Sequence, residues 1–212
     1  MDVHAIRKDY KLGNLDVKDV LPLPIDQFKK WFEEALKAEI LEPNAMILST
    51  VSEEKKPHSR VVLVKDINEN GLSFFTNYHS NKGKQIRNNN SGSLLFFWPE
   101  LERQVRFEGE IEKLTAEESL IYYHSRPRSS QIGAHVSPQS QVIPNREYLE
   151  TIQSELERKF DGLEIPIPDY WGGYLFRPTS IEFWQGRPSR LHDRLLYKLQ
   201  GDKNWKIERL AP

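Results

Sequence analysis

A succession of short apolar segments separated by turn signals is the feature that most constrains the fold of this chain. The segments are residues 45–52, 58–67, 72–76, 93–98 and 104–114. Asn70-Gly71 is a strong hairpin signal, residues 53–56 resemble a second hairpin connection, and Gly109 predicts a bulge. Each segment has the length and composition of a β-strand.

Further strand patterns close the chain, at residues 174–176, 181–185, 195–199 and 205–210. A hairpin turn is expected near Gly201-Asp202. About eight antiparallel strands of this length favour a barrel, because closure removes exposed edges. The predicted fold class is therefore mainly β with flanking helices.

Helical signals lie between the strands. An apolar stripe at the helical period predicts a helix from Asp26, a plausible N-cap, to just before Pro43. Residues 80–89 could form a short helix, and residues 145–160 carry a second clear apolar stripe. Thr115 and Glu118 form a capping-box pattern for a helix that runs to about His124. We expect one domain over residues 24–212, preceded by a flexible, irregular arm over residues 1–23.

Composition excludes several functional classes. The chain has no cysteine, which removes disulfides, thiolate metal sites and a cysteine nucleophile and favours a cytoplasmic setting. No apolar run approaches the roughly 18 to 20 residues of a membrane span, and no secretory signal is visible. The histidines lack metal-ligand spacing, and there is no dinucleotide loop or nucleophile elbow. We therefore predict no metal site and no membrane partner.

The distribution of charge is more informative than the net charge of −1, which argues against a nucleic-acid partner. Residues 70–99 contain no Asp or Glu, and neither do residues 119–146. With 31 acidic residues among 212, a window of this length should hold about four. Two such windows predict local anion pockets, unless the acidic residues simply cluster elsewhere.

Two motifs in the first half of the chain could hold anions. Arg60 and Lys65 flank a valine-rich strand, where a spacing of five places them on opposite faces unless the strand twists or bulges. Two solvated charged ends would be the alternative. Residues 76–84 carry hydroxyls, amides and lysines ahead of a helix N-terminus, which suits a phosphate but also an ordinary polar loop.

Two motifs in the second half are also rich in cations. Residues 124–135 place Arg126 and Arg128 around a proline, with serines nearby and no acid, although a solvated basic loop would look similar. Residues 181–194 combine Trp184 with several cations, as a planar anionic heterocycle requires. A lone Trp is more often part of a core.

Together these stretches resemble the pyridoxamine 5′-phosphate oxidase family. The resemblance rests on RVVLVK, LERQVR, YYHSRPRSSQIGA, SPQSQ, WGGY, IEFWQG…RLHDR and the ending NWKIERLAP, and covers about Arg7 to Pro212. It implies an FMN-binding split β-barrel that forms a homodimer with FMN at the interface. It also implies oxidation of pyridoxamine 5′-phosphate or pyridoxine 5′-phosphate to pyridoxal 5′-phosphate by O2, which yields H2O2.

The resemblance also implies functional residues. For FMN these are Arg60, Val61, Val62, Leu63, Lys65, Phe75, Thr76, Lys82, Gln104, Gln139, Ser140, Trp184 and Arg194. For the substrate they are Lys65, Tyr122, Arg126 and Ser130 at the phosphate, Arg190, Leu191 and His192 beside the pyridine ring, and Arg7, Lys8, Asp9 and Tyr10 in a mobile lid. Arg190 and His192 are the catalytic candidates.

One position departs from the family pattern. Many relatives carry Arg before the lysine that corresponds to Lys82, whereas this chain has Asn81, so one contact to the FMN phosphate is missing. The hypothesis for the reaction is hydride transfer from substrate C4′ to flavin N5. Two rival functions remain at this stage: another split-barrel flavin reductase, and a non-catalytic binder of FMN or pyridoxal phosphate.

Overall fold

The computed structural model describes residues 2–5, 9–201 and 203–212. Within them, nine strands form one antiparallel sheet: β1 (Ala45–Val51), β2 (Pro57–Leu63), β3 (Asp66–Asn68), β4 (Gly71–Asn77), β5 (Ser91–Trp98), β6 (Arg103–Lys113), β7 (Trp171–Gln185), β8 (Asp193–Leu199) and β9 (Trp205–Leu210). The helices are α1 (Pro24–Lys37), α2 (Asn81–Asn88), α3 (Ala116–Ser125), α4 (Arg128–Val136) and α5 (Arg146–Lys159), with 3-10 turns at Val17–Asp19 and Pro188–Arg190. The fold is mainly β, as predicted.

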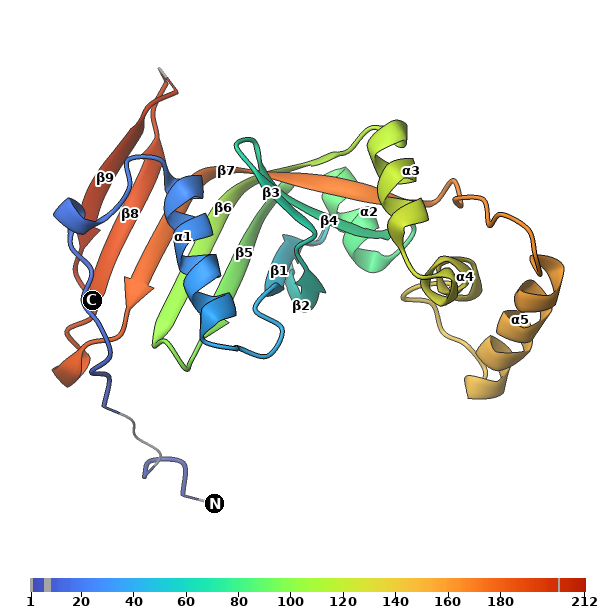
Figure 1. Ribbon diagram of the computed structural model, residues 1–212, viewed down its shortest axis with the longest axis horizontal. Coiled ribbons are helices and arrows are strands. Elements are labelled where there is room, and N and C mark those ends of the chain that lie inside the picture. Colours follow the sequence, from blue (N-terminus) through green and yellow to red (C-terminus); the bar gives the residue numbers. More distant parts are fainter. Residues whose placement is uncertain (1, 6–8, 202) are drawn as a thin grey trace.

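The long strand β7 organises the sheet. One edge of β7 pairs with β6 along its length, whereas the other edge pairs first with β4 and then with β8. The sheet therefore runs β2-β1-β5-β6-β7-β4-β3, with β8 and β9 continuing from the second half of β7. This division of one edge between two strands splits the curled sheet into two wings (Figure 1).

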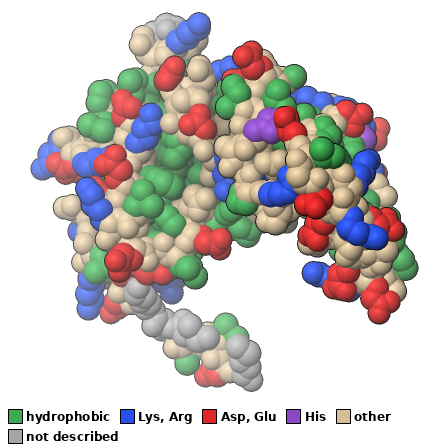
Figure 2. All heavy atoms as spheres, turned by 45° about the vertical axis from the view of Figure 1, so that its right-hand side comes forward, with side chains coloured by type: hydrophobic (Ala, Val, Ile, Leu, Met, Phe, Trp, Pro, Cys, Tyr) green, Lys and Arg blue, Asp and Glu red, His purple; other side chains and the backbone are tan. Residues whose placement is uncertain are grey.

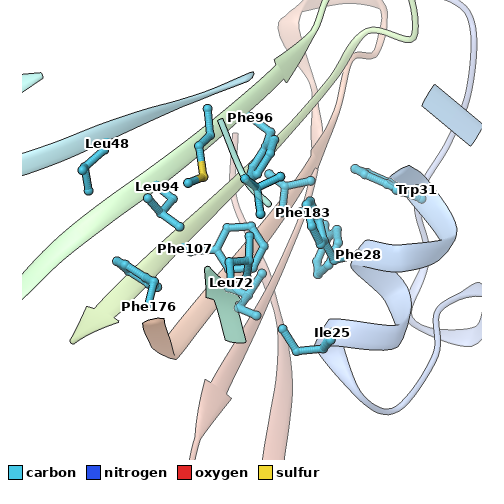
Figure 3. Close-up of a cluster of buried hydrophobic side chains, with 14 of the residues drawn as sticks. Ile25, Phe28, Trp31, Leu48, Leu72, Leu94, Phe96, Phe107, Phe176 and Phe183 are labelled. Carbon is cyan, nitrogen blue, oxygen red and sulfur yellow. The ribbon is translucent and has the colours of Figure 1, made fainter. Parts of the chain in front are cut away.

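Helix α1 closes the principal core. On its apolar face, the ring centroid of Phe28 lies 4.9 Å from the ring centroids of Phe96 and Phe107 (Figure 3). The ring centroid of Trp31 lies 5.2 Å from that of Phe183. Phe28 is fully buried. Burial of each such aromatic side chain stabilises the fold by about 1.5–3 kcal/mol, so α1 covers the β core and contributes to its stability.

The second core lies under α3, α4 and α5, which project from one end of the sheet, away from β8 and β9 (Figure 1). Tyr123, Ile132, Phe160 and Trp171 are buried in it. The two helical signals at Thr115 and Asn145 are confirmed: Thr115 and Glu118 form a capping box, and Asn145 caps α5. This end of the molecule carries one wall of the cavity described below.

Several local predictions are confirmed. Asn68 pairs with Gly71 across a tight hairpin, and the β6–β7 register shifts at Gly109, where a Cβ atom would lie 2.1 Å from the carbonyl oxygen of Arg177. The helix at residues 80–89 is also present, with Ser80 accepting the cap hydrogen bond from Gly83. The turn near Gly201-Asp202 includes a residue outside the described range.

Other predictions require correction. Helix α1 begins at Pro24, so Asp26 lies in the first turn and is not the N-cap. The segment 58–67 is two strands, interrupted at Val64 and Lys65. The segments 174–176 and 181–185 belong to one strand, because Pro178 lies at the register shift, where its missing N–H is tolerated. Helix α4 was not predicted at all.

The surface carries charges of both signs. Positive and negative side chains are interspersed over the face shown in Figure 2, and no broad area of that face belongs to one sign. Within the described residues, none of the helices has the length and apolar character needed to cross a membrane.

Candidate active site

A cavity of about 560 Å³ opens between the β2–β4 region of the sheet and helices α3 and α4. This volume is typical of a site for a small molecule or cofactor. The lining residues are Arg60, Val61, Val62, Leu63, Lys65, Phe75, Thr76, Asn77, Lys82, Tyr122, Arg126, Pro127, Ser130, Gly133, Ala134, Ser137, Gln139 and Trp171. Four of them are Lys or Arg and none is Asp or Glu, so the cavity suits an anionic ligand.

One group of donors surrounds Lys82. Its Nζ atom donates to the Thr76 hydroxyl at 3.2 Å and to Oε1 of Gln139 at 3.4 Å. Arg60 reaches the same region, where it donates to the hydroxyl of Thr50 at 2.6 Å. Burial and then the nearby charge of Arg60 lower the pKa of Lys82 to about 8. Two cations held this close, with neutral oxygens as their partners, favour a bound anion.

A second group lies around Arg126. Its guanidinium carbon is 4.5 Å from the ring centroid of Trp171, and its buried Nη1 atom has no hydrogen-bond partner among the described residues. Tyr122 stacks on Phe75 at 3.7 Å between ring centroids and forms a flat wall beside it. Burial lowers the pKa of Arg126 and raises that of Tyr122. An unpaired buried guanidinium nitrogen is costly, so this position is suited to a phosphate or carboxylate.

Lys65 and Arg60 line the same cavity, contrary to the simple strand geometry. Strand β2 ends at Leu63, and Lys65 lies in the break before β3, where its backbone N–H donates to the carbonyl of Ser73 at 2.8 Å. On either side of the break the chain pairs with different strands, β2 with β1 and β3 with β4. Consequently the alternation of a continuous strand does not apply to this pair.

Three expected cofactor residues lie elsewhere, in one row across the sheet. Gln104 on β6 pairs with Trp184 on β7, and Trp184 pairs with Arg194 on β8. Directly paired residues on neighbouring strands share a face, so these side chains form a contiguous strip. None of the three lines the cavity.

The two catalytic candidates lie beside this strip. Ser189 and Arg190 both have left-handed backbone conformations, with φ of 58° and 64°, a strain that is common at functional sites. The backbone N–H of Arg187 donates to Nδ1 of His192 at 3.1 Å, so the proton of the neutral ring is on Nε2. Burial and then Arg190 lower the pKa of His192, which favours the neutral ring.

Aromatic rings complete this second region. The ring of His192 lies 4.6 Å from that of Trp184, and Tyr10 lies 5.7 Å from both, measured between ring centroids. We call Tyr10, Trp184 and His192 the ring cluster. A planar aromatic ligand could be held against these rings by stacking and by the nearby Arg190.

The predicted site residues therefore fall into two regions. The cavity brings together Arg60, Val61, Val62, Leu63, Lys65, Phe75, Thr76, Lys82, Tyr122, Arg126, Ser130 and Gln139. The strip and its surroundings hold Tyr10, Gln104, Trp184, Arg190, Leu191, His192 and Arg194, none of which lines the cavity. Asp9 does not line the cavity either, and its exposed side chain contacts Lys11. Ser140, exposed and with a φ of 71°, follows Gln139 without lining the cavity. Arg7 and Lys8 lie outside the described residues.

The two regions lie toward opposite ends of the single chain. Strands β8 and β9 are at one end in Figure 1, whereas helices α3 and α4, which border the cavity, are toward the other. A site that uses both regions must therefore combine surfaces from two chains.

Some cavity residues were missed by the sequence analysis. They are Asn77, Pro127, Gly133, Ala134, Ser137 and Trp171. Trp171 opens the quoted WGGY motif, so its position in the motif was a signal, but nothing local indicates that Arg126 lies over its ring. Asn81 lies at the exposed start of α2.

Comparison with protein families gives two matches. Residues 32–157 match the family described as pyridoxamine 5′-phosphate oxidase. Residues 171–212 match the pyridoxine 5′-phosphate oxidase C-terminal dimerisation region. The dimerisation match covers Trp184, Arg190, His192 and Arg194, and supports a homodimer.

Individual relatives agree with these matches. A pyridoxine/pyridoxamine 5′-phosphate oxidase of Cyanothece sp. is 50% identical over 212 residues, which is 100% of this chain and 99% of that protein. A Nostoc sp. protein of the same name is 51% identical over 98% of this chain and 97% of its own length. PhzG of Burkholderia lata, crystallised with tetrahydrophenazine-1-carboxylic acid, is 30% identical with a TM-score of 0.87, over 94% of this chain and 100% of its own.

A pyridoxamine 5′-phosphate oxidase-related, FMN-binding protein of Nostoc punctiforme shares the fold at 16% identity, with a TM-score of 0.71 over 87% of this chain and 97% of that one. The cavity fits FMN on independent grounds. Among the described residues, no acidic side chain lines it, and the partly buried Lys82 has only the neutral oxygens of Thr76 and Gln139 as its hydrogen-bond partners, so a phosphate could bind there. Full-length identity near 50%, the two family matches and this cavity agree, and the chain belongs to the pyridoxamine 5′-phosphate oxidase family, an FMN-binding split-barrel family.

Proposed function

We propose that this chain is an FMN-dependent oxidase that converts pyridoxamine 5′-phosphate or pyridoxine 5′-phosphate to pyridoxal 5′-phosphate. The observation that carries the proposal is the presence of two separate anion-binding sites, here called the first and second seats, in one cavity without acidic lining residues. Lys82 and Arg60 form the first, and Arg126 with Tyr122 and Ser130 forms the second. A phosphorylated cofactor and a phosphorylated substrate together require two such seats.

The first seat is assigned to the FMN phosphate. Lys82, Arg60 and Thr76 would supply its donors, and the strand residues Val61 to Leu63 would lie along the flavin. The chemistry that bound FMN supplies is acceptance of a hydride from C4′ at N5 and reoxidation by O2, which yields H2O2. Asn81 stands where the family pattern described above would place an Arg, so this seat would have one cation fewer than that pattern implies.

The second seat is assigned to the substrate phosphate. The unpaired Nη1 of Arg126 would gain a charge-assisted hydrogen bond, and the hydroxyls of Tyr122 and Ser130 would add neutral donors. Lys65 lines the same cavity and would contact both ligands. Clamping the phosphate orients the distant C4′ carbon, which is the main contribution expected from binding residues in a reaction of this kind.

The strip is assigned to the partner's half of each site. In a homodimer, Gln104, Trp184 and Arg194 of one chain would meet the flavin bound by the other. Arg190 and the neutral His192 would lie by the pyridine ring, where Nε2–H of His192 can donate to the amine or alcohol end. With the amine substrate, the imine produced at C4′ takes up water and releases ammonia.

The test is an aerobic assay of the purified, FMN-loaded protein with pyridoxine 5′-phosphate. We expect stoichiometric H2O2 and the absorbance of the aldehyde product. A yellow protein without turnover would instead support a non-catalytic binder, and turnover only with a nicotinamide cofactor would support a flavin reductase. Pyridoxine without phosphate is the matched control and should react poorly, because the second seat would be empty.

A further inference from the structure

We propose that Glu102 and Gly186 are positioning residues that hold the N-terminal arm on the sheet and thereby place Tyr10 in the ring cluster. The arm here means residues 9–15. The inference rests on the proposed function only in assigning the ring cluster to the substrate side of the site. Neither Glu102 nor Gly186 was among the predicted site residues.

Glu102 binds the arm through its carboxylate. The Oε2 atom accepts hydrogen bonds from the backbone N–H groups of Lys11 at 2.8 Å and Leu12 at 3.0 Å. Glu102 is only 2% exposed, so its carboxylate is buried, whereas Lys11 and Leu12, which donate these bonds, are exposed residues. Two consecutive amides on one carboxylate oxygen form a charge-assisted contact that fixes both the position and the direction of the arm.

Glu102 is itself held rigidly. It lies in the connection between β5 and β6 with a φ of 55°, and its carbonyl accepts hydrogen bonds from the N–H of Gly186 at 2.8 Å and from Nε2 of Gln185 at 3.2 Å. The backbone of Glu102 is therefore tied to Gln185 and Gly186, the two residues that follow Trp184. The same few residues hold both the arm and the indole that Tyr10 contacts.

Gly186 provides the space for Tyr10. A Cβ atom at Gly186 would lie 2.7 Å from Cγ and 2.9 Å from Cβ of Tyr10, closer than real Cβ contacts. The φ angle of Gly186 is outside the left-handed range, so the backbone does not itself require glycine. The requirement is the close approach of the Tyr10 ring.

A second anchor lies further along the arm. Nη1 of Arg187 donates to the carbonyl of Gly13 at 2.8 Å, and the N–H of Leu15 donates to Oδ2 of Asp193 at 3.1 Å. Leu15 is buried at 4% exposure. The chain is thus held to the sheet at Leu15, and among the described residues the backbone hydrogen bonds to Glu102, at Lys11 and Leu12, are those nearest to Tyr10 in the sequence. Loss of that contact should free Tyr10 while leaving the rest of the arm docked.

The first experiment compares Glu102→Ala and Glu102→Gln with Glu100→Ala, an exposed acid in the same turn. Trypsin cleavage after Lys11 should be about tenfold faster in Glu102→Ala, because the flanking amides are released. KM for pyridoxine 5′-phosphate should rise about tenfold with a smaller change in kcat. Glu102→Gln, which keeps an acceptor oxygen, should be intermediate, and Glu100→Ala should match the parent protein.

The second experiment is a double-mutant cycle between Gly186→Ala and Tyr10→Ala. If Gly186 serves to admit the Tyr10 ring, Gly186→Ala should raise KM in the parent protein and have little further effect once Tyr10 is alanine. The cycle does not depend on the fold of the Glu102 variants. Equal effects of Gly186→Ala in both backgrounds would overturn the role of Gly186.

The trypsin measurement separates this proposal from the proposed function. If the parent protein shows no oxidase activity, cleavage after Lys11 still reports whether Glu102 holds the arm. Unchanged cleavage in folded Glu102→Ala would overturn the role of Glu102, whatever the activity. Faster cleavage of Glu102→Ala with an unchanged KM would also contradict the proposal. It would mean that Glu102 holds the arm but that this contact does not position Tyr10 for the substrate.

Discussion

The carboxylate of Glu182 accepts a hydrogen bond from Nε of Arg194 at 2.7 Å. Its other oxygen accepts one from Nη2 of Arg106, also at 2.7 Å. Glu182 is 3% exposed although its neighbours on the strip are partly open. Arg194, expected to contact FMN, is therefore already oriented by a buried acid of its own chain.

Removing this acid should destabilise the protein. We expect Glu182→Ala to lower the free energy of unfolding by about 1–3 kcal/mol, because two partly exposed guanidinium groups lose the buried carboxylate that both contact. Urea unfolding measures the change. Glu108→Ala, which removes the exposed partner of the same Arg106, should cost about 1 kcal/mol or less. Equal losses in the two variants would contradict a buried ion-pair network.

The contribution of Glu182 should also depend on pH. Burial alone raises the pKa of Glu182, but the hydrogen bonds and charges of Arg194 and Arg106 outweigh it and hold the pKa below its ordinary value. The stabilisation is therefore complete above the pKa of the unfolded chain, about 4.3, and is lost as pH falls through the lower pKa of the folded state. The stability difference between parent and Glu182→Gln should accordingly shrink in acid.

Binding of FMN should weaken in alkali because of Lys82. Its pKa of about 8 describes the unliganded cavity, and a bound phosphate would raise it. Affinity should therefore be steady below pH 8 and fall by up to about tenfold per pH unit above it, until the pKa of the complex is reached. Quenching of flavin fluorescence measures the dissociation constant. The decline should disappear in Lys82→Met and persist in Lys84→Met, which changes an exposed lysine of the same helix.

The two arginines expected at the substrate should differ in their kinetic effects. Arg126→Ala should raise KM for pyridoxine 5′-phosphate about 10- to 100-fold, since a buried phosphate contact is lost, with little change in kcat. Arg190→Ala should mainly depress kcat. Steady-state assays on FMN-saturated variants distinguish these outcomes, and Arg126→Lys should recover only part of the affinity because it lacks the guanidinium fork. Parent-like kinetics in both alanine variants would remove these assignments.

Mixing two inactive variants should restore activity if each site is shared between chains. Lys82→Ala impairs the cavity and Arg194→Ala impairs the strip. In a mixed dimer, one site receives both changes and the other receives neither. After equal mixing and subunit exchange, activity should approach about a quarter of the parent value. If both regions came from one chain, the mixture would stay as inactive as its components.

The sequence by itself determined the features that depend on near neighbours. The hairpin ending at Gly71, the bulge at Gly109 and the capping box of Thr115 and Glu118 each follow from the conformational or hydrogen-bonding properties of a few adjacent residues. The spaced motifs also pointed to the family. Most of the predicted residues of the two anion seats do line one cavity.

Local signals failed where distant contacts decide the structure. Helix α4 has no side-chain cap, and its stability comes from Ile132, Ala134 and Val136, which pack into the second core beside Tyr123 and Phe160. Strand β7 continues through Pro178 because the register shift against β6 removes the need for an N–H there. Rules based on residue propensities account for neither effect.

Only the tertiary structure decided how the site is assembled. It shows that Arg60 and Lys65 share a cavity, that Gln104, Trp184 and Arg194 form one strip outside it, and that Glu102 holds backbone amides about 90 positions earlier in the chain. The physical reason is that hydrogen bonds, ion pairs and ring contacts act over a few ångströms in space. Their partners here are separated by tens of residues in the sequence. Sequence periodicity does not indicate which of these distant residues come together in space.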